Sequence, residues 1–355
     1  MTIAVPGTPV RQADPAPSAA RRAPLVDRFG RVHRDLRISL TDRCPLRCTY
    51  CMPAQGVPWL PNGSILTAAE IEQVARVCAS AGMTTFRLTG GEPLLRRDVV
   101  DVVRRLARLR GPAGEPVEVA MTTNAIRLGD VLDDLVGAGL ARLNISLDTL
   151  RPERFAALTR RDRLDDVLEG IAATARSRLR PLKLNAVAMR GVNDDELVDL
   201  VEFALAHGAQ MRFIEQMPLD AGHTWDRSRM VTRDEILAVL AARWALTPEP
   251  SRGHAPAERW RLDGTGRTVG VIAAVTAPFC GGCDRLRLTA DGQLRNCLFA
   301  TAEQDLASVL RGEAGDVDTA IEAALRLSVA AKLPGHGIND PGFLQPARGM
   351  NAIGG

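Results

Sequence analysis

The sequence predicts an α/β fold in which six strand–helix units form a partial (β/α)6 barrel, followed by a smaller C-terminal α+β region. Two observations predict it: short β-rich runs alternate with amphipathic helical segments up to about residue 217, and polar residues recur where the runs end. An open doubly wound sheet is the alternative, but candidate site residues on every strand favour a barrel, whose active site lies at the carboxyl ends of its strands. The β-rich runs are LRISLT (36–41), TFRLTG (85–90), VEVAMTT (117–123), RLNISLD (142–148), LKLNAVAM (182–189) and QMRFIEQM (210–217).

The first helical segment, 67–82, carries its own boundary signals. Thr67 stands three residues before Glu70, which is the pattern of a capping box, and Gly82 follows the last apolar turn, where glycine commonly closes a helix. Cys78 lies within the apolar pattern of this helix, so we expect it in the core.

The pattern changes after residue 217. We expect short strands that form a small antiparallel layer, with helices before and after them: a helix near 232–242, strands at 259–263, 268–275 and 285–289, and helices near 302–311 and 316–332. The last residues are too rich in glycine and proline for regular structure. The predicted domains are a disordered tail (1–22), the barrel (23–230), the C-terminal region (231–340) and a flexible tail (341–355).

Composition argues against several classes of function. The chain has 45 Lys and Arg against 42 Asp and Glu, a net charge of +3, which gives no case for general nucleic-acid or membrane binding. No apolar run is long enough to span a membrane, and the first twenty residues lack the apolar stretch of a signal peptide, so we expect a cytoplasmic protein. Seven cysteines in such a chain indicate metal or redox chemistry.

The first three of these cysteines, Cys44, Cys48 and Cys51, follow the first predicted strand with the spacing C-x3-C-x2-C. A structural zinc site needs four ligands, and no fourth Cys or His is near in sequence, so a zinc loop would have to borrow a distant one. Three thiolates on a cubane [4Fe–4S] cluster leave one iron open to bind another group. The spacing therefore favours a catalytic iron–sulfur cluster.

This triplet, with the aromatic Tyr50 before its third cysteine, resembles the signature of the radical S-adenosylmethionine (SAM) family. The resemblance implies that SAM chelates the open iron and that one electron from the reduced cluster cleaves SAM. The resulting 5′-deoxyadenosyl radical then abstracts a hydrogen from the substrate. In the family, the motif that matches Thr89-Gly90-Gly91-Glu92-Pro93 binds the SAM amino group, although a Gly-Gly-Glu by itself is more often a turn.

Cys280, Cys283 and Cys297 form a second triplet without an obvious fourth ligand. His254 or His336 could complete a structural zinc site, but neither is close in sequence. In a chain that already assembles one iron–sulfur cluster, a second cluster is favoured, and its open iron could hold substrate.

Arg285 and Arg287 directly follow the Cys280–Cys283 pair. In a strand, residues two apart share one face. Guanidinium groups suit phosphate oxygens, whereas the alternative is an exposed strand face. The position beside the second triplet favours a phosphate site.

The whole arrangement resembles the GTP 3′,8-cyclase family, the radical SAM enzymes that begin molybdenum cofactor biosynthesis. The resemblance runs from about Asp27 to Gly355 and is carried by both triplets, FRLTGGEPLLRRD, RFIEQMPL, CGGCDRLRLTADGQLRNCLFA and the terminal Gly354-Gly355. It implies a lyase that converts GTP to (8S)-3′,8-cyclo-7,8-dihydroguanosine 5′-triphosphate. The radical would take the ribose C3′ hydrogen, and the ribose carbon would then bond to guanine C8.

The resemblance also assigns cofactors, partners and residues. It implies two [4Fe–4S] clusters and SAM as cofactors. It implies GTP, an electron donor and the downstream cyclic pyranopterin monophosphate synthase as partners, and it allows a homodimer. SAM contacts are expected at Tyr50, Gly91, Ser146 and Met217. GTP contacts are expected at Arg37, Arg87, Thr122, Lys183, Arg285 and Arg287. Catalytic roles are expected for Arg285, Arg287, Gly354 and Gly355, the two glycines reaching into the active site.

Two departures and two rival hypotheses remain. Ala125 stands where the family usually has glycine after Thr-Thr-Asn, and the tail before residue 23 has no counterpart. One rival is a peptide-modifying radical SAM enzyme, which would lack Arg285, Arg287 and the Gly-Gly end. The other is a zinc-stabilised nucleotide-binding module without radical chemistry. The Gly-Gly end could also be only a frayed terminus.

Overall fold

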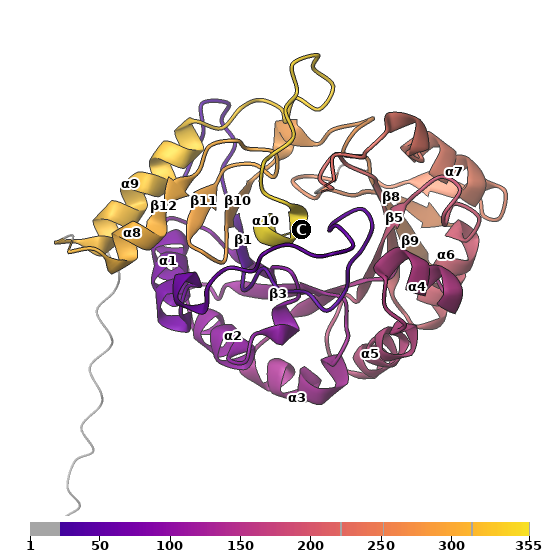
Figure 1. The fold of residues 1–355 in the computed structure, drawn as a ribbon, viewed down its shortest axis with the longest axis horizontal. Helices are drawn as coiled ribbons and strands as arrows, with labels where there is room; N and C mark the ends of the chain where they lie inside the picture. The colour runs from indigo at the N-terminus through magenta and orange to yellow at the C-terminus, as the bar shows by residue number, and fades with distance from the viewer. Residues whose placement is uncertain (1–21, 221, 251, 314, 355) are drawn as a thin grey trace, which may run out of the picture.

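One twelve-stranded sheet organises the computed structural model, which describes residues 22–354 apart from 221, 251 and 314 (Figure 1). The strands are β1 (Asp35–Ser39), β2 (Thr85–Thr89), β3 (Glu118–Thr123), β4 (Arg142–Ser146), β5 (Lys183–Ala188), β6 (Gln210–Glu215), β7 (Leu246–Pro248), β8 (Glu258–Leu262), β9 (Arg267–Ile272), β10 (Arg285–Leu288), β11 (Gln293–Arg295) and β12 (Gln304–Asp305). Their order is β12-β11-β10-β1-β2-β3-β4-β5-β6-β9-β8-β7. All pairs from β10 through β1–β6 to β9 are parallel, and the outer pairs are antiparallel.

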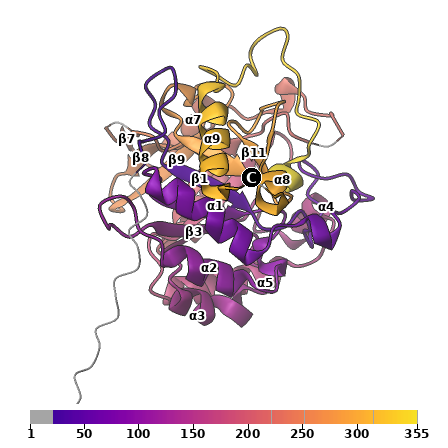
Figure 2. The ribbon, with the colours of Figure 1, turned by 90° about the vertical axis from the view of Figure 1, so that its left-hand side faces the viewer.

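Helices cover the outside of the curved sheet, as Figures 1 and 2 show. The α-helices are α1 (Ala68–Ser80), α2 (Val99–Ala107), α3 (Leu128–Ala138), α4 (Pro152–Thr159), α5 (Leu164–Arg176), α6 (Leu197–Ala206), α7 (Arg233–Ala241), α8 (Leu306–Arg311), α9 (Val317–Ala330) and α10 (Met350–Ile353). Short 3-10 helices are η1 (Asn62–Ser64), η2 (Pro93–Leu95), η3 (Arg227–Arg229) and η4 (Cys280–Gly282). The six predicted strand–helix units are confirmed, and no described helix has both the length and the apolar character of a membrane span.

The main hydrophobic core lies between the sheet and these helices. The capping box at the start of α1 is confirmed, because the Thr67 side chain accepts from the Glu70 N–H and the Glu70 carboxylate accepts from the Thr67 N–H. Gly82 follows the end of the helix with φ of +89°, as its predicted role requires. Cys78 is fully buried in this core, as expected.

After residue 217, the predicted antiparallel pairing is confirmed for β8 and β9, but the prediction that the C-terminal strands together form one antiparallel layer is wrong. β9 pairs in parallel with β6, and β10 pairs in parallel with β1, so the C-terminal strands extend the barrel sheet at both edges. An open sheet edge presents unpaired backbone N–H and C=O groups, and these two strands satisfy them. The predicted domain boundaries stay a prediction, but a single sheet runs across the one placed at residue 230.

The end of the chain packs against the barrel. The prediction of an irregular tail is wrong for Met350–Ile353, which form α10, and Figure 1 shows α10 at the centre of the ring of strands. Ile353 is 1% exposed, and Met350 packs against a small second apolar cluster formed by Leu219, Met230, Val275, Phe299 and Ile338. Residues 1–21 of the predicted disordered tail, and Gly355, lie outside the described residues.

The backbone at Ala125 adopts a conformation that favours glycine. Its φ is +63°, a left-handed conformation that costs a residue with a Cβ roughly 1–2 kcal/mol. Its buried methyl fits because Gly170 of α5 lies opposite. A Cβ on Gly170 would lie 2.8 Å from the Ala125 carbonyl oxygen and 3.0 Å from the Ala125 Cβ.

We therefore expect Gly170→Ala to lower the free energy of unfolding by about 1–3 kcal/mol, because the added methyl overpacks this contact. Gly137→Ala is the matched control: Gly137 is also helical, but an added Cβ there meets nothing within 4 Å. That variant should gain about 0.5–1 kcal/mol from better helix propensity. Urea unfolding of both proteins measures the contrast, and equal changes would contradict the tight packing at Ala125.

Candidate active site

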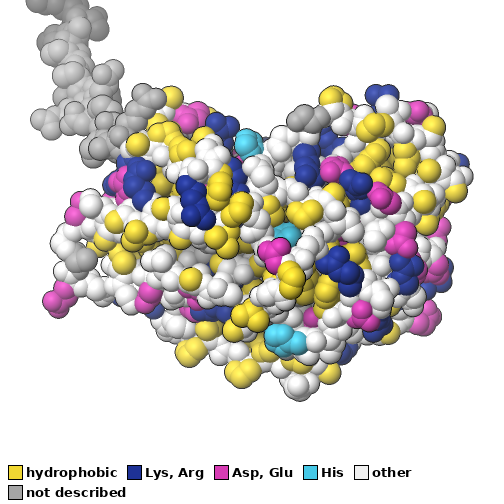
Figure 3. Space-filling model, turned by 90° about the horizontal axis from the view of Figure 1, so that it is seen from above, with side chains coloured by type: hydrophobic (Ala, Val, Ile, Leu, Met, Phe, Trp, Pro, Cys, Tyr) yellow, Lys and Arg dark blue, Asp and Glu magenta, His cyan; other side chains and the backbone are white. Residues whose placement is uncertain are grey.

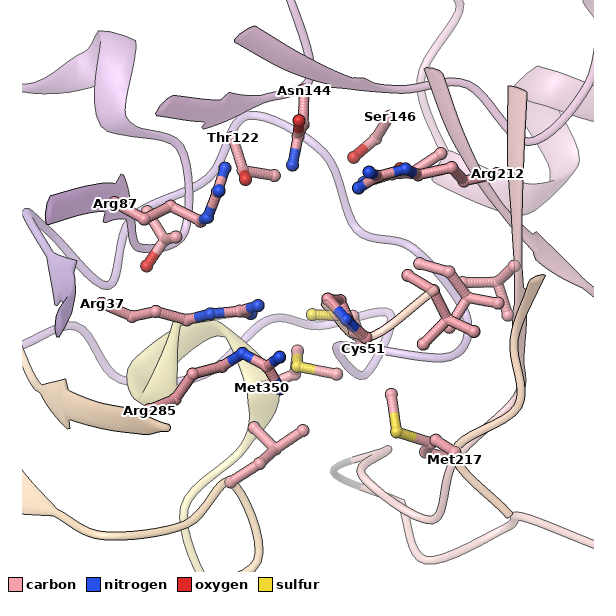
Figure 4. Close-up of a pocket in the computed structure, with 18 of the residues that line it drawn as sticks. Arg37, Cys51, Arg87, Thr122, Asn144, Ser146, Arg212, Met217, Arg285 and Met350 are labelled. Carbon is pink, nitrogen blue, oxygen red and sulfur yellow. The ribbon is translucent and has the colours of Figure 1, made fainter. Parts of the chain in front are cut away.

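A cavity of about 510 Å³ occupies the inside of the barrel, and polar side chains of the strands point into it (Figure 4). The structure brings almost all of the predicted site residues to this one cavity. Its lining includes Cys44, Cys48, Cys51, Cys280, Cys283, Cys297, Tyr50, Gly91, Ser146, Met217, Arg37, Arg87, Thr122, Lys183, Arg285 and Arg287. Gly354 lies beside it, and Gly355 lies outside the described residues.

The first cysteine triplet follows β1 at the barrel mouth. Burial raises the pKa of Cys44 and of Cys51 to about 12, with a further contribution from Glu92 at Cys44, so these thiols stay protonated without a partner. A bound metal ion would favour the thiolate form of these cysteines, because coordination deprotonates a thiol. Asn124 donates from its side-chain amide to the Cys44 sulfur at 3.8 Å.

Among the described residues, no three His, Cys, Asp or Glu side chains are grouped to hold a single metal ion. A cubane cluster has a different requirement, since its thiolates bind separate iron atoms. Three cysteines side by side on the wall of a cavity, with room in front of them, fit a group of that kind.

The Gly-Gly-Glu segment packs directly on the cysteine loop. The Gly91 N–H donates to the Thr41 carbonyl, and the Glu92 N–H donates to the Arg43 carbonyl, both at 2.7 Å. A Cβ on Gly90 or Gly91 would collide with this backbone, so the two glycines allow the close approach of the two loops.

The Glu92 carboxylate is used within the protein. It accepts hydrogen bonds from the Thr123 hydroxyl at 2.7 Å and from the Asn124 and Leu94 N–H groups, and so joins the end of β2 to the end of β3. Burial outweighs these hydrogen bonds and raises the pKa of Glu92 to about 7.

Tyr50 is held against the opposite wall of the barrel. Its hydroxyl donates to Asp148 at 2.7 Å, and Asp148 also accepts from the Val187 N–H at 2.8 Å. Burial raises the pKa of Asp148 to about 6. This contact connects the cysteine loop to the ends of β4 and β5.

Basic side chains converge on the inside of the barrel from several strands. Arg37 of β1 is in register with Arg87 of β2 and with Arg287 of β10, so three guanidinium groups lie side by side on neighbouring strands. Figure 4 shows Arg37, Arg87 and Arg285 reaching into the cavity from one side and Arg212 from the other. Burial lowers the pKa of Arg37 and Arg87 and brings that of Arg212 to about 9.

Lys183 of β5 belongs to the same cationic group. Burial, followed by repulsion from Arg212, Arg142 and Arg87, lowers its pKa to about 7. Few carboxylates face this group: Asp35 and Asp284 line the cavity, and Glu118, which pairs with Arg142, also acts on Lys183 and Arg87. Buried cations that outnumber their counter-charges define a site for an anion.

Unpartnered polar atoms support the same conclusion. Within the described chain, six buried side-chain atoms around the cavity lack a hydrogen-bond partner: Asp35 Oδ1, Arg37 Nε, Arg87 Nη1, Thr89 Oγ1, Asn144 Oδ1 and Asn185 Oδ1. Buried polar groups are nearly always satisfied in proteins, so this cavity fits a ligand rich in hydrogen-bonding groups.

In the second cysteine triplet, Cys280 begins η4, Cys283 directly follows it, and Cys297 lies in the loop after β11. Lys332 donates to the Cys283 sulfur at 3.6 Å, and Arg285 donates to it at 3.9 Å. Burial raises the pKa of Cys283, but these two cations outweigh burial and lower it overall. Burial raises the pKa of Cys280.

The two histidines considered as zinc ligands both line the cavity. Both ring nitrogens of His336 are engaged, one with the Ala274 carbonyl at 2.8 Å and the other with the Ile338 N–H at 3.2 Å. His254 Nδ1 lies 2.8 Å from the Gly282 carbonyl oxygen, within the second cysteine loop. His336 is therefore not available as a fourth ligand in this arrangement.

Arg285 and Arg287 point into the cavity from β10, so the prediction that they share one face is confirmed and the alternative of an exposed face is wrong. Arg287 Nη1 donates to the carbonyl of Gly354. Gly354 has φ of +83°, and a Cβ there would collide with the hydroxyls of Ser39 and Thr89. The end of the chain therefore reaches the inner wall of the barrel through a position that suits only glycine.

Several lining residues were missed from the sequence, among them Arg142, Asn144, Asn185 and Arg212. A signal was present: Asn144 stands two residues before Ser146, and Asn185 two residues after Lys183, so strand alternation places them on the same inner face. The run that contains Arg212 predicted a strand but gave no sign that this side chain lines the site.

The charge distribution inside the barrel differs from that on the outer surface. On the face shown in Figure 3, acidic and basic groups are interspersed.

A cysteine triplet above a parallel β/α barrel, packed on a Gly-Gly-Glu strand end, defines a radical SAM protein. The sequence model of the Radical SAM superfamily matches residues 38–204, and that of Molybdenum Cofactor Synthesis C matches residues 209–338. The chain is 51% identical to the GTP 3′,8-cyclase of Mycobacterium sp. (strain KMS) over the full length of both, and 53% identical to that of Streptomyces coelicolor over 93% of this chain and 96% of the relative. The chain belongs to the GTP 3′,8-cyclase family.

Among solved structures, the chain is similar to Streptococcus suis SuiB, with a TM-score of 0.58 and 14% identity over 84% of this chain and 68% of that one. A SuiB structure bound to S-adenosylmethionine gives a TM-score of 0.56 with 13% identity, over 85% of this chain and 69% of that one. At these identities the likeness shows the fold alone.

The buried ammonium of Lys183 predicts a pH-dependent stability. Its pKa is about 7 in the folded protein and near its ordinary value of 10.5 in the unfolded chain. Between these values the unfolded chain binds more protons, so this residue destabilises the fold fully below about pH 7 and less as the pH rises. Without nucleotide, we expect Lys183→Met to be more stable than the wild type at about pH 6.5 and to keep less than half of that advantage at about pH 9.

Denaturant unfolding at the two pH values measures this difference. Lys183→Arg is the control, since arginine remains charged at both pH values. The stability difference between Lys183→Arg and Lys183→Met should therefore be the same at both pH values. A stability difference between wild type and Lys183→Met that is equal at both pH values would contradict the inferred burial of the charge.

Proposed function

We propose that the chain is a radical SAM GTP 3′,8-cyclase, a lyase that forms (8S)-3′,8-cyclo-7,8-dihydroguanosine 5′-triphosphate from GTP as the first step of molybdenum cofactor biosynthesis. One observation carries the proposal: the two cysteine triplets and a group of buried cations line the same cavity. Membership of the GTP 3′,8-cyclase family supports the same activity.

In this proposal Cys44, Cys48 and Cys51 hold the first [4Fe–4S] cluster, and Cys280, Cys283 and Cys297 hold the second. When bound, the first cluster and SAM supply the radical that removes the ribose C3′ hydrogen. The protein itself binds and orients the two ligands and keeps water out. SAM contacts are assigned to Tyr50, Gly91, Ser146 and Met217, all of which line the cavity.

The cations of the barrel bind the triphosphate. Arg37, Arg87, Lys183 and Arg212 come from four different strands, so they can surround several phosphate oxygens at once. Their burial is costly without an anion, and a bound triphosphate removes that cost. Thr122 adds a hydroxyl to the same wall.

Arg285 and Arg287 continue this wall toward the second triplet. Arg285 lies within 3.9 Å of the Cys283 sulfur, so the nucleoside end of GTP is placed beside that triplet when the phosphates face the other cations. Arg287 holds Gly354 against Ser39 and Thr89. The terminus then limits the space in which the ribose and guanine can move.

The proposal extends to partners and location. Reduction of the cluster consumes one electron, so an electron donor must bind or reach the enzyme. In this proposal, cyclic pyranopterin monophosphate synthase takes up the product, and the enzyme is cytoplasmic because GTP and SAM are cytoplasmic metabolites.

Substitutions in the two triplets should have different effects on the reaction. Cys48→Ala should abolish 5′-deoxyadenosine formation, because two thiolates no longer hold a cluster with a chelatable iron. Replacement of Cys280, Cys283 and Cys297 with Ala should remove about four iron atoms per chain and abolish the cyclised product while the first cluster still assembles. Anaerobic assays with SAM, GTP and dithionite, with iron analysis and mass spectrometry of the products, measure both effects.

Cys78→Ala is the matched control, since Cys78 is buried in the helical core and should leave both clusters in place. Normal deoxyadenosine yield from Cys48→Ala would exclude the radical SAM function. Constant iron with loss of zinc in the triple variant would make the second site a structural zinc site.

The chain terminus gives a further prediction. Deletion of Gly354-Gly355 should leave iron content and SAM cleavage intact but strongly impair cyclisation, because Arg287 loses its backbone partner. Gly354→Ala should act in the same direction, since its Cβ would displace Ser39 or Thr89. Gly342→Ala is the control in the same segment, because an added Cβ there meets nothing within 4 Å. Wild-type turnover by the truncated, iron-replete enzyme would show that the terminus has no part in the reaction.

A further inference from the structure

Lysine is almost absent from this chain. Of its 45 basic residues only two are lysines, Lys183 and Lys332, and the rest are arginines. Both lysines are buried, with exposed fractions of 9% and 3%, whereas the surface cations are arginines. Arginine occupies all the remaining basic positions, so the compact ammonium group is found only at two interior positions. Lys183 belongs to the cationic wall of the cavity, and Lys332 does not line it.

Lys332 follows α9 and reaches the second cysteine triplet. Its ammonium donates to the carbonyl oxygen of Arg285 at 2.6 Å and to the sulfur of Cys283 at 3.6 Å. The first contact ties the residue to the start of β10. The second places a positive charge directly behind a predicted cluster ligand, on the side away from the cavity.

The surroundings of Lys332 provide no carboxylate partner. In the described chain no ion pair joins it to Asp or Glu. The Asp27 carboxylate pairs instead with Arg31 at 2.6 Å and with His33 at 3.3 Å. His33 stays neutral, because burial, and then repulsion from Lys332, lowers its pKa to about 4. Arg285 adds a further positive charge.

An ammonium buried without a counter-charge would be strongly unfavourable. The group that can balance it is the thiolate of Cys283, together with the negative charge of a cluster held by three thiolates. The geometry also explains the choice of lysine, since a guanidinium is larger and planar and Arg285 already occupies the adjacent side of the sulfur.

We propose that Lys332 is a positioning residue that holds the Cys283 thiolate and stabilises the reduced state of the second iron–sulfur cluster by its positive charge. The inference rests on the proposed second cluster. Each electron added to that cluster increases its negative charge, so a fixed cation behind one ligand favours reduction. Removing the cation therefore makes the cluster harder to reduce.

Lys332→Met tests this in the full-length holoenzyme, because methionine keeps an unbranched side chain without the charge. Potentiometric titration followed by electron paramagnetic resonance should show a tenfold or greater shift toward the oxidised second cluster, a midpoint about 59 mV more negative for a one-electron couple. The first cluster should keep its midpoint. Lys332→Arg, which retains the charge, should lie nearer to the wild type.

Lys183→Met is the matched control, since it removes the other buried lysine and should weaken GTP binding without moving the midpoint of the second cluster. An unchanged midpoint in Lys332→Met, or equal midpoints in Lys332→Met and Lys332→Arg, would overturn the proposal. A lower thermal stability with no change in midpoint would make Lys332 only a link between α9 and β10. The signal of the second cluster is identified by its loss in the Cys280/Cys283/Cys297 variant; if no signal is lost there, the proposed second cluster itself fails.

Discussion

The burial of positive charge inside the barrel is the constraint on which the rest of the site depends. Guanidinium and ammonium groups from β1, β2, β5, β6 and β10 face one interior, with few carboxylates among them. Such an interior is costly for the empty protein and favourable for a polyanion, so the same side chains that reduce stability provide affinity. The hydrophobic contacts between sheet and helices must supply the stability that the interior does not.

Two adjacent strands, β1 and β10, connect this interior to both cysteine triplets. β1 leads into the first triplet and pairs with β10, which follows the second. A single register along Arg87, Arg37 and Arg287 therefore fixes the anion site relative to the two triplets. The loops add buried carboxylates that join neighbouring strand ends, as Glu92 joins β2 to β3. Radical chemistry requires such fixed positions, because a reactive intermediate must meet only its intended partner.

Much of this arrangement could be predicted from the sequence, and the failures have identifiable causes. The six strand–helix units were predictable because apolar periodicity and helix caps are local signals. The placement of β9 and β10 was not, because strand pairing between distant segments leaves no local trace, and alternating arginines in RLRLT resemble a solvent-exposed face. Arg212 and Asn185 were missed since a polar lumen makes inward positions look like surface. The packing of α10 depends on tertiary contacts of Ile353 and Gly354 that composition does not reveal.

The pairing of β1 with β10 also has a consequence for the order in which the molecule is made. About 250 residues separate Asp35 from its partner Arg285. At synthesis rates of about 5–20 residues per second, β1 remains an unpaired edge for roughly 10–50 s on the ribosome. Contacts of such long sequence separation form slowly and expose the nascent sheet to wrong partners. Completion of the fold, and with it the second cysteine triplet, is therefore a late event in the life of each new chain.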